Sequence, residues 1–480
     1  MFDHKRFKLD KSYRMSEISN YIQEVFDEED TIEEKQLTES LFLNNDNVYF
    51  NTFIRLKNEQ KEKDPHYHIL RQIFEKEWNN FKLKYRALLT RDGINVSIER
   101  MLRCQDPDEG YLTYVCPHCQ KTKTILMTCK SRFCPTCGKK AREKQTLNVT
   151  RKLANVPHRQ LVFSVPYDLR NYFRIYRDTM LNSLFTTVDE TINSCMTRHS
   201  PLATKNEKRR LGFVSFLHTY GRDLKWHPHL HVLIAERYMK NDNKLHKFSY
   251  FSYEYLRKTF FNKLLHNMYY ALKKLLKENL TTKTEINKFY KLWQELKIKY
   301  KDGYYVYGPR LKSFKDENTG LTLKTMKALT KYVARYASHP AISESRILSY
   351  DPIKHLVTWY YEPHEDDNKE ESEKLGKQII TESAEEFIKK LIIHIPDIGF
   401  KMIRYYGFYS QASKIYPNED ELIMSEKDYQ IRKRNITFET LMMQTFGYSP
   451  FLCSCGHRMF LDMDKSNIPK TRRLSNYGIM

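Results

Sequence analysis

Two segments in the middle of the chain have the hydrophobic pattern of buried strands. Residues 211–220 read Leu-Gly-Phe-Val-Ser-Phe-Leu-His-Thr-Tyr, and residues 226–235 read Trp-His-Pro-His-Leu-His-Val-Leu-Ile-Ala. The intervening Gly-Arg-Asp-Leu at 221–224 predicts a turn, so we expect the two segments to form an antiparallel hairpin. If the turn centres near residues 223 and 224, His218 lies opposite His229.

Three histidines occupy alternate positions of the second segment. His227, His229 and His231 therefore share one face of the strand, and neighbouring members of the set lie roughly 7 Å apart along it. Two imidazoles held in this way can converge on one divalent metal, although a half-buried strand with hydrogen-bonded histidines is the simpler alternative. His218 is the preferred third ligand, and His227, at the strand entrance beside Pro228, is the alternative.

Helical periodicity follows over residues 325–336, where Met326, Leu329, Val333 and Tyr336 form a core stripe. Tyr332 lies four positions before Tyr336, so their rings share one helix face. A tyrosine there could attack a DNA phosphate and form a covalent phosphotyrosine. Because the chain has 34 tyrosines, a core role alone would also explain the pair. The neighbouring basic stripe is a candidate DNA contact and includes Lys327, Lys331 and Arg335.

Other patterns predict the surrounding elements. Strands are expected at 159–165 and near 303–307, and a hairpin at 347–361. Helices are expected at 65–90, 169–200, 260–279 and 384–394, the last starting with the capping-box sequence Ser383-Ala-Glu-Glu386. An acidic loop is expected at 362–374, and the tail from Lys427 onward is predicted to be basic and irregular. No internal repeat is visible.

The charge distribution points to a polyanionic partner. The chain has 81 Lys and Arg against 59 Asp and Glu, a net charge of +22. Residues 16–47 hold ten carboxylates and one lysine, a local charge of −9, so the rest of the chain carries +31. The 34 Tyr and 27 Phe interleaved with these cations favour single-stranded nucleic acid, because bases stack on aromatic rings.

We expect a cytoplasmic protein without a membrane partner. The charged opening Met-Phe-Asp-His-Lys-Arg does not resemble a signal peptide. No apolar stretch approaches the roughly 20 residues that span a bilayer. In the cytosol thiols stay reduced, and paired cysteines there usually bind metal rather than form disulfides.

Six of the nine cysteines lie between residues 104 and 137. Cys116-Pro-His-Cys119 and Cys134-Pro-Thr-Cys137 are two Cys-x-x-Cys knuckles, each able to present two thiolates to one tetrahedral Zn²⁺. Cys104 and Cys129 are possible additional zinc ligands. Cys453-Ser-Cys455 is too closely spaced for a standard knuckle and is a weak signal. The basic residues around the second knuckle are candidate DNA contacts, namely Lys130, Arg132, Lys139 and Lys140.

The order of these motifs resembles a known family. A double Cys-x-x-Cys module is followed by His227-Pro-His-Leu-His231 and then by Tyr332-Val-Ala-Arg-Tyr336. This combination is similar to the two-tyrosine HUH transposases of rolling-circle insertion sequences, of the insertion-sequence ninety-one type. The resemblance runs from about His68 to Gly407 and includes Ser131-Arg-Phe-Cys-Pro-Thr-Cys-Gly138, His218-Thr-Tyr-Gly221 and the segment 395–407.

The resemblance implies a mechanism and a fold. Carried onto this sequence, His229 and His231 would hold Mg²⁺ or Mn²⁺, and Tyr332 and Tyr336 would be the nucleophiles that nick and rejoin single-stranded DNA. Relatives with a single active tyrosine exist, which leaves the role of one of the two open. The implied fold is α+β, with an HUH endonuclease core of a central antiparallel sheet and flanking helices, preceded by a small zinc-binding module.

The expected organisation has four parts. Residues 1–60 form an acidic extension, 61–148 a helix plus the zinc-binding module, 149–350 the catalytic domain with a lysine-rich helical insertion at about 237–303, and 351–480 a C-terminal hairpin, helix and basic tail. The expected partner is single-stranded DNA at element ends and target site, with no small-molecule cofactor, in the nucleoid; the oligomeric state stays open. The alternatives are a rolling-circle replication initiator and a non-catalytic zinc-ribbon regulator that binds nucleic acid.

Overall fold

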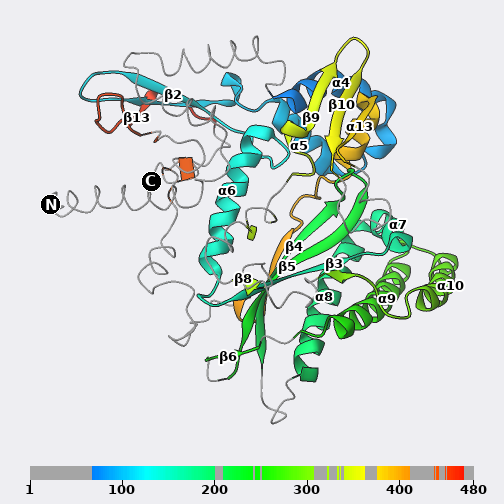
Figure 1. Cartoon of the computed structure of the whole chain (residues 1–480). Helices are drawn as coiled ribbons and strands as arrows, with labels where there is room; N and C mark the ends of the chain where they lie inside the picture. The colour runs from blue at the N-terminus through cyan, green and yellow to red at the C-terminus, as the bar shows by residue number, and fades with distance from the viewer. Residues whose placement is uncertain are drawn as a thin grey trace.

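The computed structural model describes the chain from residue 68 to residue 469 with gaps. The described residues are 68–199, 209–241, 244–248, 251–307, 322–323, 332–333, 336, 340–362, 376–410, 437, 439, 441–442, 449 and 451–469. Their strands form three antiparallel sheets, and the largest has helices against it (Figure 1). The acidic extension and the predicted acidic loop at 362–374 lie outside the described residues, apart from Glu362.

The central sheet contains the two histidine strands. Its order is β12-β4-β5-β3-β7, with β6 paired to β5 and β8 paired to β3. His218 on β4 pairs with His229 on β5, so the predicted hairpin and its register are confirmed. The strand bounds are β3 His158–Ser164, β4 Arg210–Tyr220, β5 Trp226–Met239, β6 Leu245–Lys247, β7 Val306–Tyr307, β8 Thr322–Leu323 and β12 Ile403–Tyr406.

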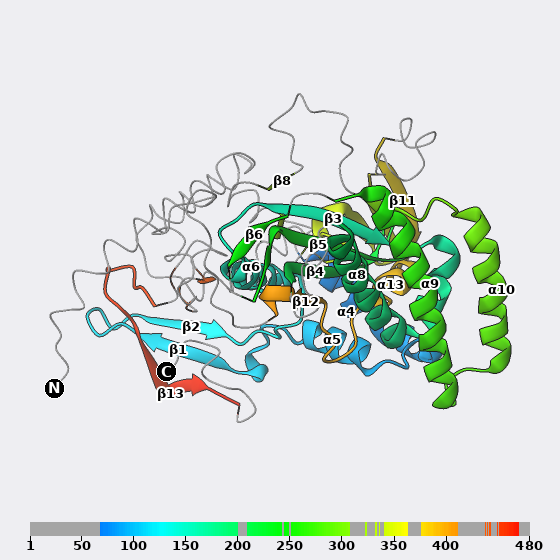
Figure 2. The ribbon, with the colours of Figure 1, turned by 90° about the horizontal axis from the view of Figure 1, so that it is seen from below.

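Four helices lie on one face of this sheet and form the largest core with it (Figures 1 and 2). Three of them contact the strands, and the fourth, α10, packs on α9. That core includes Phe163, Phe213 and Leu230 from the strands. The predicted helix 169–200 is interrupted at Tyr176, whose φ of −104° and ψ of 51° are not helical. The helices are α7 Arg170–Ile175, α8 Arg177–His199, α9 Tyr253–Lys277 and α10 Lys283–Lys299.

The opposite face of the central sheet is covered by helix α6, Pro135–Lys152. Val149 of α6 and Leu153, which follows its last residue, pack with Val214 and Phe216 of β4 and with Leu233 of β5. Successive side chains of a strand point to opposite faces. His218 therefore shares the face of Val214 and Phe216, and His229 and His231 share the face of Leu233. The histidines thus lie on the α6 side of the sheet.

A second module combines segments from both halves of the chain. Helices α4 Ile69–Lys84 and α5 Asp92–Leu102 share a core with helix α13 Ala384–Ile392 and a three-stranded sheet of order β11-β10-β9. The strands are β9 Ile347–Asp351, β10 Leu356–Tyr361 and β11 Gln378–Ser383. Phe74 and Trp78 meet Trp359 and Phe387 in this core. The Ser383 hydroxyl accepts from the Glu386 backbone N–H and caps α13, as its sequence predicts.

The third sheet joins the cysteine region to the C-terminal tail (Figure 2). Strands β1 Tyr111–Val115 and β2 Thr122–Leu126 form a hairpin, and β13 Phe460–Asn467 pairs antiparallel with the other edge of β1. The prediction of an irregular tail from Lys427 onward is therefore wrong for this segment. Its alternation is weak because much of the strand is exposed, so the sequence carries little of the period that identifies a half-buried strand.

The predicted α+β fold, a central antiparallel sheet with flanking helices preceded by a small zinc-binding module, is confirmed. The described part of the chain contains no helix both long and apolar enough to cross a bilayer. Short 3₁₀ helices complete the description, at Arg86–Leu88, Pro107–Glu109, Tyr167–Leu169, Glu344–Arg346 and Gly407–Tyr409.

Gly407 closes the turn after edge strand β12, and its replacement by alanine is expected to destabilise the fold. Its φ is +57°, and an added Cβ would lie 2.0 Å from the Leu211 carbonyl oxygen. The left-handed conformation and the clash together should lower the free energy of unfolding by about 3 kcal/mol. Denaturant unfolding would measure the loss. Gly399→Ala is the matched control, because its φ is +80° but no atom lies within 4 Å of the added Cβ. Equal losses in both variants would contradict the clash.

Candidate active site and metal centres

Three imidazoles converge on the α6 side of the β4–β5 hairpin. The Nε2 atoms of His229 and His231 are 3.1 Å apart, and the ligand atoms of His218, His229 and His231 all lie within 4.8 Å of one another. We call these three residues the histidine site. Two ligands at right angles around a metal, with bonds of roughly 2.1 Å, would be separated by about 3 Å. The His229–His231 spacing fits that arrangement.

The tautomer of His229 is set by the backbone. The His229 Nδ1–H donates to the His227 carbonyl oxygen at 2.8 Å, which leaves the Nε2 lone pair for a metal. The His231 Nδ1 atom is buried and has no hydrogen-bond partner among the described residues. The His218 Nε2 donates to the Tyr336 carbonyl oxygen at 3.0 Å. The two converging Nε2 atoms of His229 and His231 are the donor set that fits a metal ion.

Burial keeps the rings of His229 and His231 neutral. Burial lowers the pKa of His229 to about 4, and burial together with the nearby His218 holds the pKa of His231 well below its usual range. A neutral imidazole is the form that binds metal, because its lone pair is not protonated. His229 and His231 are therefore in a metal-binding form at neutral pH.

The His227 ring lies 5.1 Å from the His229 ring, but His227 is not one of the three residues whose ligand atoms converge. Its Nε2 meets the Ser164 hydroxyl at 3.2 Å, and its carbonyl accepts from His229. Burial lowers its pKa to about 2. The His227 carbonyl orients the His229 ring. The third residue of the convergent set is His218, not His227.

The two tyrosines differ in their surroundings. Tyr332, Val333 and Tyr336 have helical conformation, and the rings of Tyr332 and Tyr336 lie 4.6 Å apart. The Tyr336 ring is half-buried and stacks on His231, with 3.8 Å between the ring centroids. Tyr332 is 6% exposed, its hydroxyl donates to the Val232 carbonyl at 3.4 Å, and burial raises its pKa well above its usual range. Tyr336 is thus the tyrosine in contact with the histidine site.

The cysteines form two clusters rather than one. Cys104, Cys129, Cys134 and Cys137 make the first, which we call the Cys104 cluster, with sulfur separations of 3.6 Å for Cys104–Cys137 and 3.5 Å for Cys129–Cys137. Four thiolates around tetrahedral Zn²⁺, at bonds of roughly 2.3 Å, would be about 3.8 Å apart. The backbone N–H of Ser131 also donates to the Cys129 sulfur at 3.4 Å, which favours a thiolate.

The second set, which we call the Cys116 cluster, joins the first knuckle to the tail. Cys116 and Cys119 meet Cys455 and Cys453, with sulfur separations of 3.5 Å for Cys116–Cys455 and 3.5 Å for Cys119–Cys453. The interpretation of Cys453-Ser-Cys455 as a weak signal is therefore corrected: these residues complete a four-sulfur set. The two knuckles do not face each other, because each is paired with cysteines outside the two knuckles.

Comparison with known proteins decides the family. A family model described as "Putative transposase" matches residues 212–415, and one described as "Transposase zinc-binding domain" matches residues 73–165. The chain is 26% identical over 375 residues to "Transposase for insertion sequence element IS801" of Pseudomonas savastanoi pv. phaseolicola, covering 76% of this chain and 82% of that protein. The chain belongs to the insertion-sequence transposases of the IS91 type.

A further relative of this transposase covers a similar share of the chain. It is "Putative transposase y4qJ" of Sinorhizobium fredii, 24% identical over 357 residues, which cover 70% of this chain and 83% of that protein. No solved structure matches. The match to the first family model runs from β4 through the tyrosines past β12, whereas the zinc-binding match ends before Cys453 and Cys455. Cys453 and Cys455 therefore lie outside the matched zinc-binding segment in the sequence of the transposase. They meet Cys116 and Cys119 of that segment only in the folded chain.

The predicted DNA-contact residues of the transposase divide by position. Lys130, Arg132 and Lys139 are exposed around the Cys104 cluster, so they are accessible to a polyanion. Lys140 is half-buried, and burial lowers its pKa to about 8. The stripe residues Lys327, Lys331 and Arg335 lie outside the described residues.

Proposed function

We propose that this transposase nicks and rejoins single-stranded DNA at insertion-sequence ends through a covalent 5′-phosphotyrosine, with Mg²⁺ or Mn²⁺ held by His218, His229 and His231. The observation that carries the proposal is the stacking of the Tyr336 ring on His231 at 3.8 Å, beside the converging nitrogens of His229 and His231. A candidate nucleophile and a candidate metal site thus occupy one place on the sheet. Membership of the transposase family supports DNA as the substrate.

The bond changes balance without an external energy source. The Tyr336 hydroxyl oxygen attacks the phosphorus, and the bond from phosphorus to the 3′ oxygen breaks. The tyrosine proton is released and the departing 3′ oxygen takes up a proton, which gives a 3′ hydroxyl and a tyrosine ester of the 5′ phosphate. Attack by another 3′ hydroxyl reverses the step and joins two strands. The ester conserves the bond energy, so rejoining needs no ATP.

The histidine side chains would hold the metal, which when bound draws negative charge from the phosphoryl oxygens. The His227 carbonyl holds the His229 ring, and the hydrogen bond from His218 to the Tyr336 carbonyl links a metal ligand to the nucleophile's own backbone. Imidazole nitrogen suits Mn²⁺ better than Mg²⁺, which prefers oxygen ligands. We therefore expect Mn²⁺ to support cleavage at a lower concentration than Mg²⁺.

Tyr332 is proposed as the second nucleophile, which receives the other strand later in the reaction. Its hydroxyl is buried against Val232, so it must leave that contact before it can reach a phosphate. The two tyrosines would then act in a fixed order, Tyr336 before Tyr332. The order follows from their burial, because their spacing along the helix alone does not distinguish them.

The direct test incubates the full chain with a single-stranded oligonucleotide that carries an end of its element, with Mn²⁺ or Mg²⁺, and separates the products on a denaturing gel. We expect a covalent protein–DNA adduct, a released 3′-hydroxyl fragment and little reaction with the duplex of the same sequence. His229→Ala and His231→Ala should each lose the adduct, whereas Lys291→Ala, an exposed substitution on α10, should keep it. Absence of an adduct with either cognate end and both metals would overturn the proposal.

A further inference from the structure

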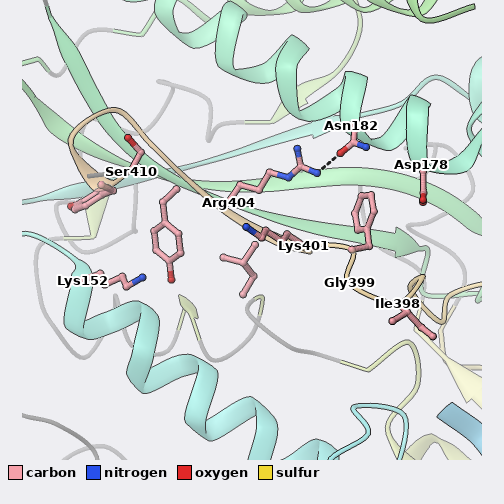
Figure 3. Close-up of a pocket in the computed structure, with 12 residues that line it drawn as sticks. Lys152, Asp178, Asn182, Ile398, Gly399, Lys401, Arg404 and Ser410 are labelled. Atoms are coloured by element: carbon pink, nitrogen blue, oxygen red, sulfur yellow. Dashed lines mark hydrogen bonds between the residues drawn. The ribbon is translucent and has the colours of Figure 1, made fainter. Parts of the chain in front are cut away.

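Two adjoining cavities lie along edge strand β12. The first, drawn in Figure 3, extends from Lys152 at the end of α6 across β12 to Asp178 and Asn182 of α8, and the second lies beside α6. The first has a volume of about 730 Å³ and is lined in part by Lys152, Lys401, Arg404 and Tyr405. The second, of about 600 Å³, shares Lys152 and Tyr405 and adds polar residues of α6. We call the two cavities together the α6 groove.

The groove is lined by residues of β12, and β12 is the neighbour of β4, the strand that carries His218. β12 pairs with β4 so that Tyr405 lies opposite Val214 and Ile403 lies opposite Phe216. The Leu217 backbone N–H donates to the Met402 carbonyl at 2.9 Å, which extends the contact towards His218. In this register Lys401 lies beside His218, and alternation places Lys401 and Tyr405 on the histidine face. Lys401 is therefore the groove residue that this register places level with His218.

The side chains of the groove match the chemistry of a single nucleic-acid strand. Its lining contains four cations, Arg151, Lys152, Lys401 and Arg404, against the one carboxylate of Asp178. The Lys152 Nζ lies 4.3 Å from the centre of the Tyr405 ring, so a cation and an aromatic face are presented together. Single-strand binding sites combine cations for phosphates with rings for base stacking. Duplex DNA offers no unstacked base for such a ring.

The polar face of α6 continues the groove from Lys152 towards the helix N-terminus. Gln145, Asn148 and Arg151 or Lys152 are spaced three or four residues apart, so they share one face of the helix. The helix is about 27 Å long and begins at Pro135, between two ligands of the Cys104 cluster. This face of α6 therefore runs from the Cys104 cluster to the central sheet.

We propose that the α6 groove binds the single DNA strand adjacent to the cleaved phosphate and leads it from the histidine site along α6 towards the Cys104 cluster. This inference rests on the proposed function, because it assumes that cleavage occurs at the histidine site. Arg151, Lys152 and Lys401 contact successive phosphates, and Tyr405 stacks on a base. Arg404 is held by the side-chain amide oxygen of Asn182 and lines the outer edge of the groove.

The first test measures binding of a fluorescent single-stranded oligonucleotide to the full chain without added Mn²⁺ or Mg²⁺. The double variant Lys152→Ala/Lys401→Ala should bind about tenfold more weakly. Its slope of log affinity against log salt should fall by about 1.4, because two phosphate contacts are lost. The matched control Lys283→Ala/Lys291→Ala removes two exposed lysines of α10 and should bind like the wild type. Unchanged affinity in the groove variant, or an equal loss for duplex DNA, would overturn the proposal.

The second test uses the wild-type chain and so does not depend on the folding of a variant. An oligonucleotide with 5-iodouracil next to the cleavage position is irradiated with the protein, and the linked peptide is identified by mass spectrometry. The proposal expects a crosslink to Tyr405, and a crosslink confined to other segments would overturn it. Both tests report without cleavage. If DNA binds in the groove but no adduct forms, the proposed function fails by itself; an adduct without groove binding overturns only this inference.

Discussion

Tyr336→Phe is expected to reduce the first covalent adduct by about three orders of magnitude or more, because it removes the attacking oxygen. Tyr332→Phe is expected to keep the adduct, because the Tyr332 hydroxyl is buried against the Val232 carbonyl rather than placed at the histidine site. Its cost should be about 1 kcal/mol in the free energy of unfolding, from one lost hydrogen bond. The measurement is single-turnover adduct formation with each variant.

A strand-transfer assay separates the roles further. With two cognate ends present, Tyr332→Phe should stop after the first adduct if Tyr332 receives the second strand. An adduct formed by Tyr336→Phe at the wild-type rate would reverse the assignment of the first nucleophile. Equal activity of both single variants, with loss only in the double variant, would mean that the two tyrosines are interchangeable and that the order inferred from burial is wrong.

Replacing both tail cysteines by alanine is expected to halve the zinc content of the purified protein, from two ions per chain to one. Cys453 and Cys455 supply two of the four sulfurs in the Cys116 cluster, and loss of two ligands from a structural site normally abolishes binding. β13 should then detach from β1. Elemental analysis would give the zinc content, and limited proteolysis would show release of the C-terminal segment.

Two further variants make this result specific. Cys195→Ala removes a buried cysteine of the main helical core and should retain both ions. His118 and His457 lie close to Cys455 and could supply nitrogen ligands. A variant that also carries His457→Ala removes the nitrogen ligand that the tail could supply. Two zinc ions per chain in this last variant would show that the tail does not contribute to the metal site.

The local parts of the site could be predicted from sequence. The strand hairpin and the pairing of His218 with His229 follow from alternation and turn chemistry over about 25 residues. The α+β fold was expected from the family resemblance. The cysteine knuckles were visible because their spacing is short and regular. Periodicity also predicted that Tyr332 and Tyr336 share a helix face. It could not predict that Tyr332 is the more buried of the two, because its burial depends on packing near Phe216.

The parts that could not be predicted depend on contacts between distant segments. Cys119 and Cys453 are separated by 334 positions, and no local pattern relates them. Strand β13 is largely exposed and lacks a strong period, so its pairing with β1 was not visible. The α6 groove also required the structure, because β12 and α6 come together only at the edge of the sheet.

The pairing of residues near position 116 with residues near position 455 has a consequence for synthesis on the ribosome. The tail strand and its cysteines are translated after every other described element, so the Cys116 cluster cannot be completed until they emerge. A copy of the gene interrupted by a premature stop before Cys453 would yield a chain that retains the histidine site but lacks half of this cluster. A complete Cys116 cluster thus distinguishes a chain translated through Cys455 from one interrupted before Cys453.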